Sequence, residues 1–279
     1  MKKATVAGTG FPEISMIDSA RCAIFTFNER GEVISELPTA GAGFDFWHLP
    51  DGNFLYCHLG GVGHGVSVVT PENEVITRYI GKSEIFCCQP LDNGYILAGE
   101  LTEKRIAIIA PTGKLEEVIP VKSEVSGHEV MRAARQTANG DYLVVHPGDR
   151  VIRRYGKTGE LLAEYKTRND TFAVVEKGDG HLLYTAQTAL VELDENGKEV
   201  WVMSKEDNFK GLGIHWFTGM QLLPDGSVIL CNWLGHGREG TGVPILAVSP
   251  EKKILWTMEA HDFTSDPANI QAEGIITGK

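Results

Sequence analysis

Nine histidines are the residues of this sequence most able to carry chemistry, because a neutral imidazole can bind a metal ion, transfer a proton or hydrogen-bond a polar ligand. His128 and His215 are the strongest acid/base candidates; Glu129 directly follows His128, and Trp216 directly follows His215. His128, His215 and Glu129 could bind a divalent metal ion such as Mn, Zn or Ca. They could equally form a hydrogen-bonding rim without a metal, since ligands from distant segments leave no short-range motif.

Arg132 is the candidate for binding an anion or a carboxylate, which a planar guanidinium can contact through two hydrogen bonds. Arg135 lies three residues further on, and an odd separation places two side chains on opposite faces of a strand. We therefore expect only Arg132 to face a shared site, as a third catalytic residue beside the two histidines.

The substrate-binding candidates combine carboxylates, aromatic rings and cations that could contact a hydroxylated or planar ligand. They are Glu84, Glu129, Trp216, Asn232, Trp233, His236 and Arg238. Segment 233–243 contains four glycines and could either approach a ligand closely or be a flexible surface loop.

Familiar catalytic motifs are absent from the sequence. It contains no GxSxG nucleophile elbow, no GxxxxGK[ST] phosphate loop and no HExxH zinc helix. Its five cysteines include no CxxC pair, which argues against a disulfide scaffold or a zinc knuckle. Any active site must therefore combine residues from distant segments.

An internal repeat indicates the elements that would position these residues. In its first unit, an Asp-Gly or Asn-Gly turn precedes an apolar run, a strong signal for a β-hairpin with a type I′ turn. This unit occurs five times, at 50–55, 92–97, 138–143, 178–183 and 224–229. A second turn-plus-apolar unit occurs six times, at 28–33, 71–75, 111–115, 157–161, 195–200 and 250–254.

Two hairpins in about 40 residues are typical of one four-stranded antiparallel propeller blade. We predict an all-β fold in which residues 1–279 form a single six-bladed β-propeller. From the axis outward, the strands of the second blade are expected near 43–48, 53–58, 66–70 and 74–79.

The two ends of the chain are expected to share one blade and so close the ring. Ala4–Ala7, Ala23–Phe27 and Glu32–Leu37 have the pattern of a second, third and fourth strand without a first. The apolar segment Glu273–Thr277 would supply the missing inner strand. Such closure removes sheet edges that could promote aggregation.

Propeller topology places seven of the nine histidines on the face where the inner strands begin, which is where propellers usually bind ligands. These are His58, His64, His128, His146, His215, His236 and His261, whereas His48 and His181 lie beside turns of the opposite face. Loops are polar in any case, so each of these histidines could also have a surface or structural role.

The repeated hairpins resemble those of six-bladed PQQ-like and NHL/SMP-30-like repeat proteins. Segments 215–226 and 232–237, with their His-Trp and Asn-Trp pairs, are most similar to a largely uncharacterised bacterial branch of these proteins. The resemblance implies the fold, but it implies no bound PQQ or nucleotide, because the tryptophan docking motifs of quinoprotein dehydrogenases are not evident. A more distant similarity is to arylsulfotransferases, whose full signature is not matched.

The net charge of −11 and the lack of a Lys/Arg-rich stripe argue against binding to nucleic acid or to an anionic membrane surface. No apolar run after the N-terminal lysines is long enough for a signal peptide or a membrane span. We therefore expect a cytoplasmic protein.

The leading hypothesis is a lyase or hydrolase acting on a carbohydrate-like small molecule, by histidine acid/base chemistry or with a histidine-bound metal. The alternative is a non-catalytic module that binds a ligand or a protein partner.

Overall fold

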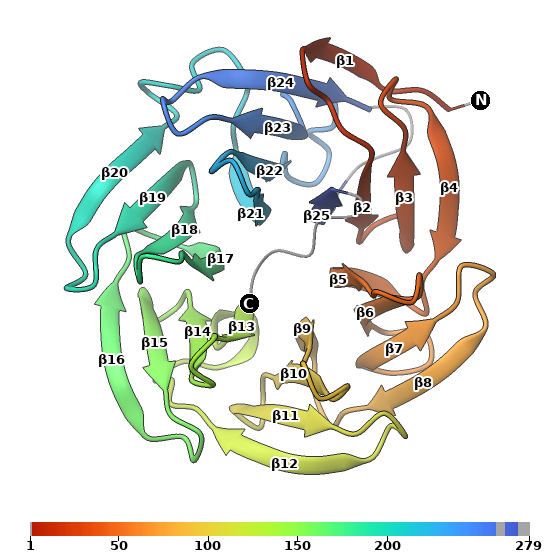
Figure 1. Cartoon of the computed structure of the whole chain (residues 1–279), viewed down its shortest axis with the longest axis vertical. Helices are drawn as coiled ribbons and strands as arrows, with labels where there is room; N and C mark the ends of the chain where they lie inside the picture. The colour runs from red at the N-terminus through yellow and green to blue at the C-terminus, as the bar shows by residue number, and fades with distance from the viewer. Residues whose placement is uncertain (1, 261–265, 273–279) are drawn as a thin grey trace.

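The computed structural model describes residues 2–260 and 266–272, which form six antiparallel sheets arranged as a ring (Figure 1). Four of these sheets, blades 2 to 5, each consist of four consecutive strands with the first strand innermost. Blade 2 contains β5 (Ala42–His48), β6 (Phe54–Leu59), β7 (Gly65–Val69) and β8 (Val75–Ile80). Blade 3 contains β9 (Ile85–Pro90), β10 (Ile96–Glu100), β11 (Arg105–Ile109) and β12 (Leu115–Pro120). Blade 4 contains β13 (Ala133–Gln136), β14 (Tyr142–His146), β15 (Val151–Tyr155) and β16 (Leu161–Lys166). Blade 5 contains β17 (Thr171–Glu176), β18 (Leu182–Ala186), β19 (Ala189–Leu193) and β20 (Glu199–Ser204).

The two remaining blades close the ring, and each incorporates a strand from the opposite end of the chain. Blade 1 has the order β25 (Pro267–Ala272), β2 (Ile14–Asp18), β3 (Ala23–Phe27) and β4 (Val33–Pro38). Blade 6 has β21 (Trp216–Leu222), β22 (Val228–Trp233), β23 (Ile245–Val248) and β24 (Ile254–Glu259), with β1 (Thr5–Gly8) as a fifth, outer strand. The predicted six-bladed, four-stranded all-β fold, closed by a blade from both chain ends, is confirmed.

The strands that close the ring differ in part from those expected. The segment 4–7 is not the second strand of blade 1; β1 pairs with β24, and β2 takes the expected place. A Cβ at Gly8 would lie 2.3 Å from the carbonyl oxygen of Leu255, and its φ of +109° favours glycine, so this residue lets β1 lie against blade 6. The predicted inner strand 273–277 lies outside the described residues, and β25 forms the inner edge of blade 1.

The predicted Asp-Gly and Asn-Gly hairpins are present, but their turns are not of type I′. At the tip of the β5–β6 hairpin, Gly52 alone has a positive φ, of 85°. Its N–H donates to the Leu49 carbonyl at 2.9 Å, and the Leu49 N–H donates to the Asn53 carbonyl at 2.8 Å. A type I′ turn needs two residues with positive φ. The repeat therefore encodes a longer turn that ends in one left-handed glycine.

Apolar side chains from neighbouring blades pack face to face and form the core. Between blades 1 and 6, for example, Met16 and Phe25 share a buried cluster with Ile245 and Trp256.

The cysteines are free thiols, and burial raises the pKa of Cys87 to about 12, so this thiol is not a nucleophile at neutral pH. A three-residue 3₁₀ turn, η1 (Gly127–Glu129), is the single helix of the described chain, in which no helix could cross a membrane.

His146, placed by its sequence position on the ligand-binding face, is completely buried and has a structural role. Its Nδ1 lies 2.5 Å from the Val130 carbonyl oxygen, and its Nε2 lies 3.1 Å from the Tyr155 hydroxyl. The same hydroxyl also bonds to the backbone of Lys122. His146 and Tyr155 thus fix both ends of the connection between β12 and β13, which carries His128. His58 is buried in a similar way, with Nδ1 3.0 Å from the Gly63 carbonyl oxygen.

Burial gives His146 a measurable effect on stability at low pH. Desolvation lowers its pKa to about 4, so between about pH 6.5 and pH 4 the unfolded chain binds a proton that the folded chain does not. We expect this difference to reduce the free energy of unfolding by about 3 kcal/mol as the pH falls through that range. Denaturant titrations of the wild type and of His146→Gln at several pH values measure it. Parallel pH slopes for the two proteins would contradict the assignment.

Candidate functional site

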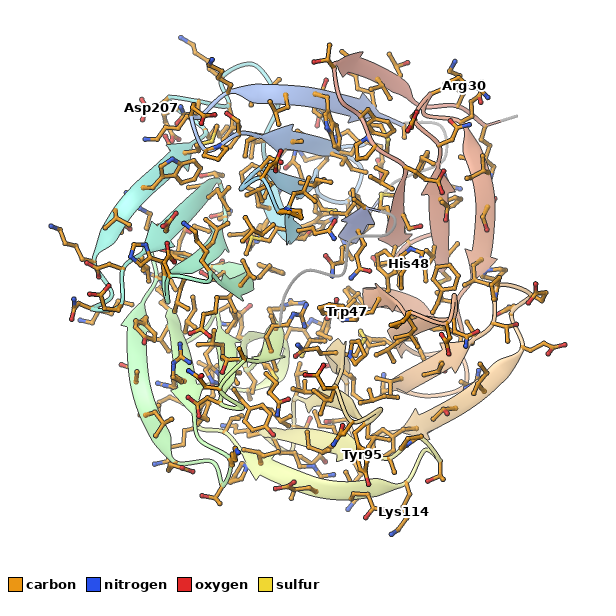
Figure 2. All side chains as sticks on the ribbon, in the orientation of Figure 1. Arg30, Trp47, His48, Tyr95, Lys114 and Asp207 are labelled. Carbon is orange, nitrogen blue, oxygen red and sulfur yellow. The ribbon has the colours of Figure 1, made fainter. Side chains whose placement is uncertain are left out.

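A cavity of about 330 Å³ lies at the axis of the ring, at the end where the inner strands begin. Each blade contributes the side chain four residues before the last residue of its inner strand; in blade 4 this residue directly precedes β13. We call these six residues the upper ring: Phe44, Phe86, Arg132, Phe172, Thr218 and Ala268. Figure 2 shows Trp47, a deeper lining residue, beside the central opening. Three phenylalanines thus line one part of the mouth, with Arg132 between two of them in blade order.

His128 lies at this mouth and forms a hydrogen-bonded pair with Glu84. The distance from His128 Nε2 to Glu84 Oε1 is 3.0 Å, and the imidazole packs on Phe86 with ring centroids 5.0 Å apart. A carboxylate acceptor keeps the proton of a neutral imidazole on Nε2 and leaves the lone pair of Nδ1 free. His128 is about half exposed, so Nδ1 is available to a ligand.

Arg132 also contacts Phe86 and is held between two aromatic rings. Its Cζ is 4.4 Å from the centroid of Phe86 and 4.7 Å from that of Phe172. Its Nε is buried without a hydrogen-bond partner, and no direct ion pair of this side chain is found among the described residues, although four carboxylates act on it from a longer distance: Glu84, Glu129, Asp170 and Asp266. Burial lowers the pKa of Arg132, although a guanidinium stays charged at neutral pH. An unpaired cation inside a cavity is a binding group for an anion.

Two tryptophans and two histidines from the segments around β21 and β22 form an aromatic cluster beside the cavity. Trp216 and Trp233 lie with centroids 6.1 Å apart; His215 packs on both, and His236 packs on Trp233 at 5.2 Å. Trp216 also contacts Phe172 at 5.4 Å. Only Trp233 and His236 of these four line the cavity.

Asn232 is fully buried and orients this cluster instead of facing a ligand. Its Oδ1 accepts the backbone N–H groups of His215 and Trp216 at 2.9 and 3.1 Å. Its Nδ2 donates to the Val243 carbonyl at 2.8 Å. The sequence-based expectation that Asn232 binds substrate does not agree with this burial, since all of its polar atoms are engaged.

A buried network in the wall of the cavity joins four blades. Asp45 in blade 2 pairs with Arg135 of blade 4 at 2.9 Å and accepts the N–H of Cys88 in blade 3 at 3.0 Å. Its second oxygen accepts from Asn269 in blade 1. Arg135 lines the cavity as well as Arg132, contrary to the expectation that only one of them would. The inner strand has no neighbour on its axial edge, so side chains from both of its faces reach the channel.

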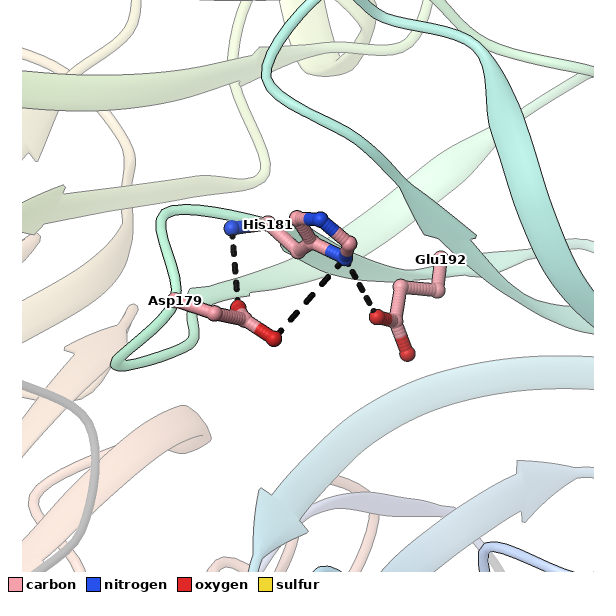
Figure 3. A group of neighbouring side chains, drawn as sticks. All are labelled: Asp179, His181 and Glu192. Atoms are coloured by element: carbon pink, nitrogen blue, oxygen red, sulfur yellow. Dashed lines mark hydrogen bonds and ion pairs between the residues drawn. The ribbon is translucent and has the colours of Figure 1, made fainter.

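The described residues do not bring His128, His215 and Glu129 together as metal ligands. The one group of three potential ligands whose atoms lie within 4.8 Å of one another in the described chain is Asp179, His181 and Glu192 (Figure 3). Asp179 and His181 lie in the β17–β18 turn and Glu192 in β19, and Lys177 already pairs with Glu192 at 2.7 Å. The positive charge of Lys177 occupies the position to which a metal cation would be attracted.

The sequence-predicted site residues thus divide into three groups. His128, Arg132, Trp233 and His236 line the cavity, and Glu84 supports His128. His215, Trp216 and Asn232 are not among the lining residues. Glu129 and Arg238 are exposed outside the lining, and His261 lies outside the described residues. Sequence reasoning missed Phe44, Phe86 and Phe172, although their shared position in the repeat could have identified them.

Comparison with protein-family models finds no match, and comparison with curated proteins finds none either. Solved structures do match. A protein of unknown function from Bacteroides caccae superposes with a TM-score of 0.83 at 19% identity, covering 93% of this chain and 98% of the other. Selenomethionine-substituted virginiamycin B lyase from Staphylococcus aureus has a TM-score of 0.63 at 12% identity, covering 91% and 84%. A catalytically inactive histidine-to-alanine variant of that lyase, with quinupristin, has a TM-score of 0.65 at 13% identity, covering 98% and 93%. At these identities the similarity shows the propeller fold.

Proposed function

We propose that this protein is a small-molecule lyase whose active site is the axial cavity, with His128 as the base. The observation that carries the proposal is the His128–Glu84 pair at 3.0 Å beside the unpaired guanidinium of Arg132. Both side chains contact the same ring, Phe86, and both line the cavity, so we place one substrate in contact with the two. A base next to a cation suits the removal of a proton from carbon adjacent to a carbonyl or carboxylate group.

In the proposed reaction, His128 Nδ1 removes this proton, and Arg132 stabilises the negative charge that develops on the substrate oxygen. The electron pair of the broken C–H bond then forms a carbon–carbon double bond. The bond from the next carbon to its oxygen or nitrogen substituent breaks, and the leaving group departs with that electron pair. His128 returns the proton to the leaving group, which restores the neutral imidazole.

The composition of the cavity supports elimination over covalent catalysis. No serine or cysteine occurs among the described lining residues, and the single hydroxyl, that of Thr218, donates to the Pro267 carbonyl at 2.9 Å. The similarity to virginiamycin B lyase, which an alanine in place of one histidine inactivates, adds weight to a histidine-dependent lyase. A divalent metal at the mouth and a carbohydrate-like substrate stay predictions from the sequence.

Product analysis of a substrate panel tests the proposal. The panel contains small carboxylates and esters with an oxygen or nitrogen substituent on the second carbon. A lyase yields two products whose masses add up to that of the substrate, one with a new conjugated double bond that absorbs in the ultraviolet. Two products whose masses add up to that of the substrate plus one water would instead indicate that the His128–Glu84 pair activates water for hydrolysis. Ligand binding without any product would support the alternative of a binding module.

A further inference from the structure

The geometry points to a specific ligand class for the axial cavity: a monocarboxylate with a flat, apolar body. This inference builds on the proposed function, because it names the substrate class of the same site. It rests on the surroundings of Arg132, on the engagement of the other polar groups and on the asymmetry of the upper ring.

Arg132 has its guanidinium between Phe86 and Phe172, with Cζ 4.4 and 4.7 Å from the ring centroids. Rings on two sides leave the N–H edge of the guanidinium for a ligand. That edge has a fork of donors which matches the two oxygens of a carboxylate. The Nε donor has no protein partner although it is buried, a state that costs free energy unless a ligand accepts its hydrogen bond.

Most other polar side chains of the cavity are committed to bonds between blades. The Oε1 of Gln271 accepts the His48 N–H at 2.9 Å, and the Oε1 of Gln221 accepts the Ala272 N–H at 2.5 Å. Asp45 is saturated by Arg135, Cys88 and Asn269. Apart from Asp266 and the two histidines of the lining, a ligand with many hydroxyl groups would therefore find few free partners, whereas a ligand with one anionic group finds Arg132.

The upper ring provides the space and the surface for an apolar body. Thr218 and Ala268, from blades 6 and 1, are its two smallest members, and Ala268 comes from the blade three positions away from that of Arg132. In a ring of six this is the opposite side, so a ligand anchored at Arg132 extends across the mouth toward Ala268. Phe44, Phe86 and Phe172 line its path with aromatic surface. A volume of about 330 Å³ fits a small ligand.

Calorimetric titration with matched probes tests this inference. The probes are 3-phenylpropanoate, its neutral amide, phenyl phosphate and glucuronate. We expect the carboxylate to bind about tenfold to a hundredfold more tightly than the amide, because it gains charge-assisted hydrogen bonds. It should also bind more tightly than phenyl phosphate and glucuronate. Equal affinity for acid and amide, or preference for the phosphate or for the sugar acid, would overturn the ligand class.

Two substitutions at Arg132 assign the effect to this residue. Arg132→Met should reduce the ratio of affinities for acid and amide to about one, and Arg132→Lys should retain only part of it, because an ammonium lacks the planar fork. Arg30→Met, at an exposed arginine on the outer side of the ring, should leave the ratio unchanged (Figure 2). An unchanged ratio in Arg132→Met would contradict the inference. Selective binding of the acid, together with no conversion of any compound in the substrate panel, would support the ligand class and contradict the lyase proposal, so the two failures are distinguishable.

Discussion

Replacing His128 by glutamine is expected to lower kcat about 100- to 10,000-fold for any panel compound that the wild type converts. This is the range that a positioned general base contributes. Glutamine retains a polar side chain of similar size but has no basic nitrogen. Because His128 is about half exposed, the variant should fold with unchanged stability. Initial rates of product formation at saturating substrate measure the effect.

Two further variants separate the role of the base from a general effect of losing a histidine. Glu84→Gln should lower kcat less, about tenfold to a hundredfold, because it weakens the orientation of His128 without removing the base. His181→Gln, on the opposite face of the ring, should leave kcat unchanged. Full activity in His128→Gln would remove His128 from the mechanism.

Replacing Asp45 by alanine is expected to have the largest effect on stability, a loss of about 3–5 kcal/mol. The variant leaves the Arg135 guanidinium buried without its counter-charge and removes bonds that join blade 2 to blades 1, 3 and 4. Denaturant unfolding at neutral pH measures the loss. Glu36→Ala, at an exposed ion pair with Lys2, is the matched control and should cost less than about 1 kcal/mol.

A double substitution separates the unpaired charge from the lost packing. In Asp45→Ala/Arg135→Met no buried charge remains, so part of the stability should return. If Asp45→Ala alone costs no more than the Glu36 control, the network does not hold the blades together.

The fold could be predicted because the same types of turn residue recur at regular intervals along the chain. The repeated hairpins contain a residue with positive φ, in most of them a glycine such as Gly52, and the spacing of the hairpins determines the number of blades. The strand at the N-terminus was assigned to the wrong blade because Thr5–Gly8 does form a strand, and its sequence does not show which blade it joins. Only three-dimensional pairing shows that it completes blade 6 while Ile14–Asp18 enters blade 1.

The candidate site could be predicted only in part, because loop position does not determine the direction of a side chain. His146 and His128 both belong to segments of the ligand-binding face, yet His146 points into the protein and holds the connection that carries His128. The pairing of His128 with Glu84 joins residues 44 positions apart and has no local signal. Phe86 and Phe172 were missed because phenylalanine in an inner strand resembles ordinary core.

Hydrogen exchange at the substrate is the most direct test of the claim that His128 acts as a base in the axial cavity. In D₂O, nuclear magnetic resonance follows the loss of the proton next to the carboxylate of a ligand that binds at Arg132. We expect the wild type to replace this proton by deuterium, even in compounds without a leaving group, and His128→Gln to leave it in place. Exchange at the same rate in both proteins, or in neither, would contradict the account.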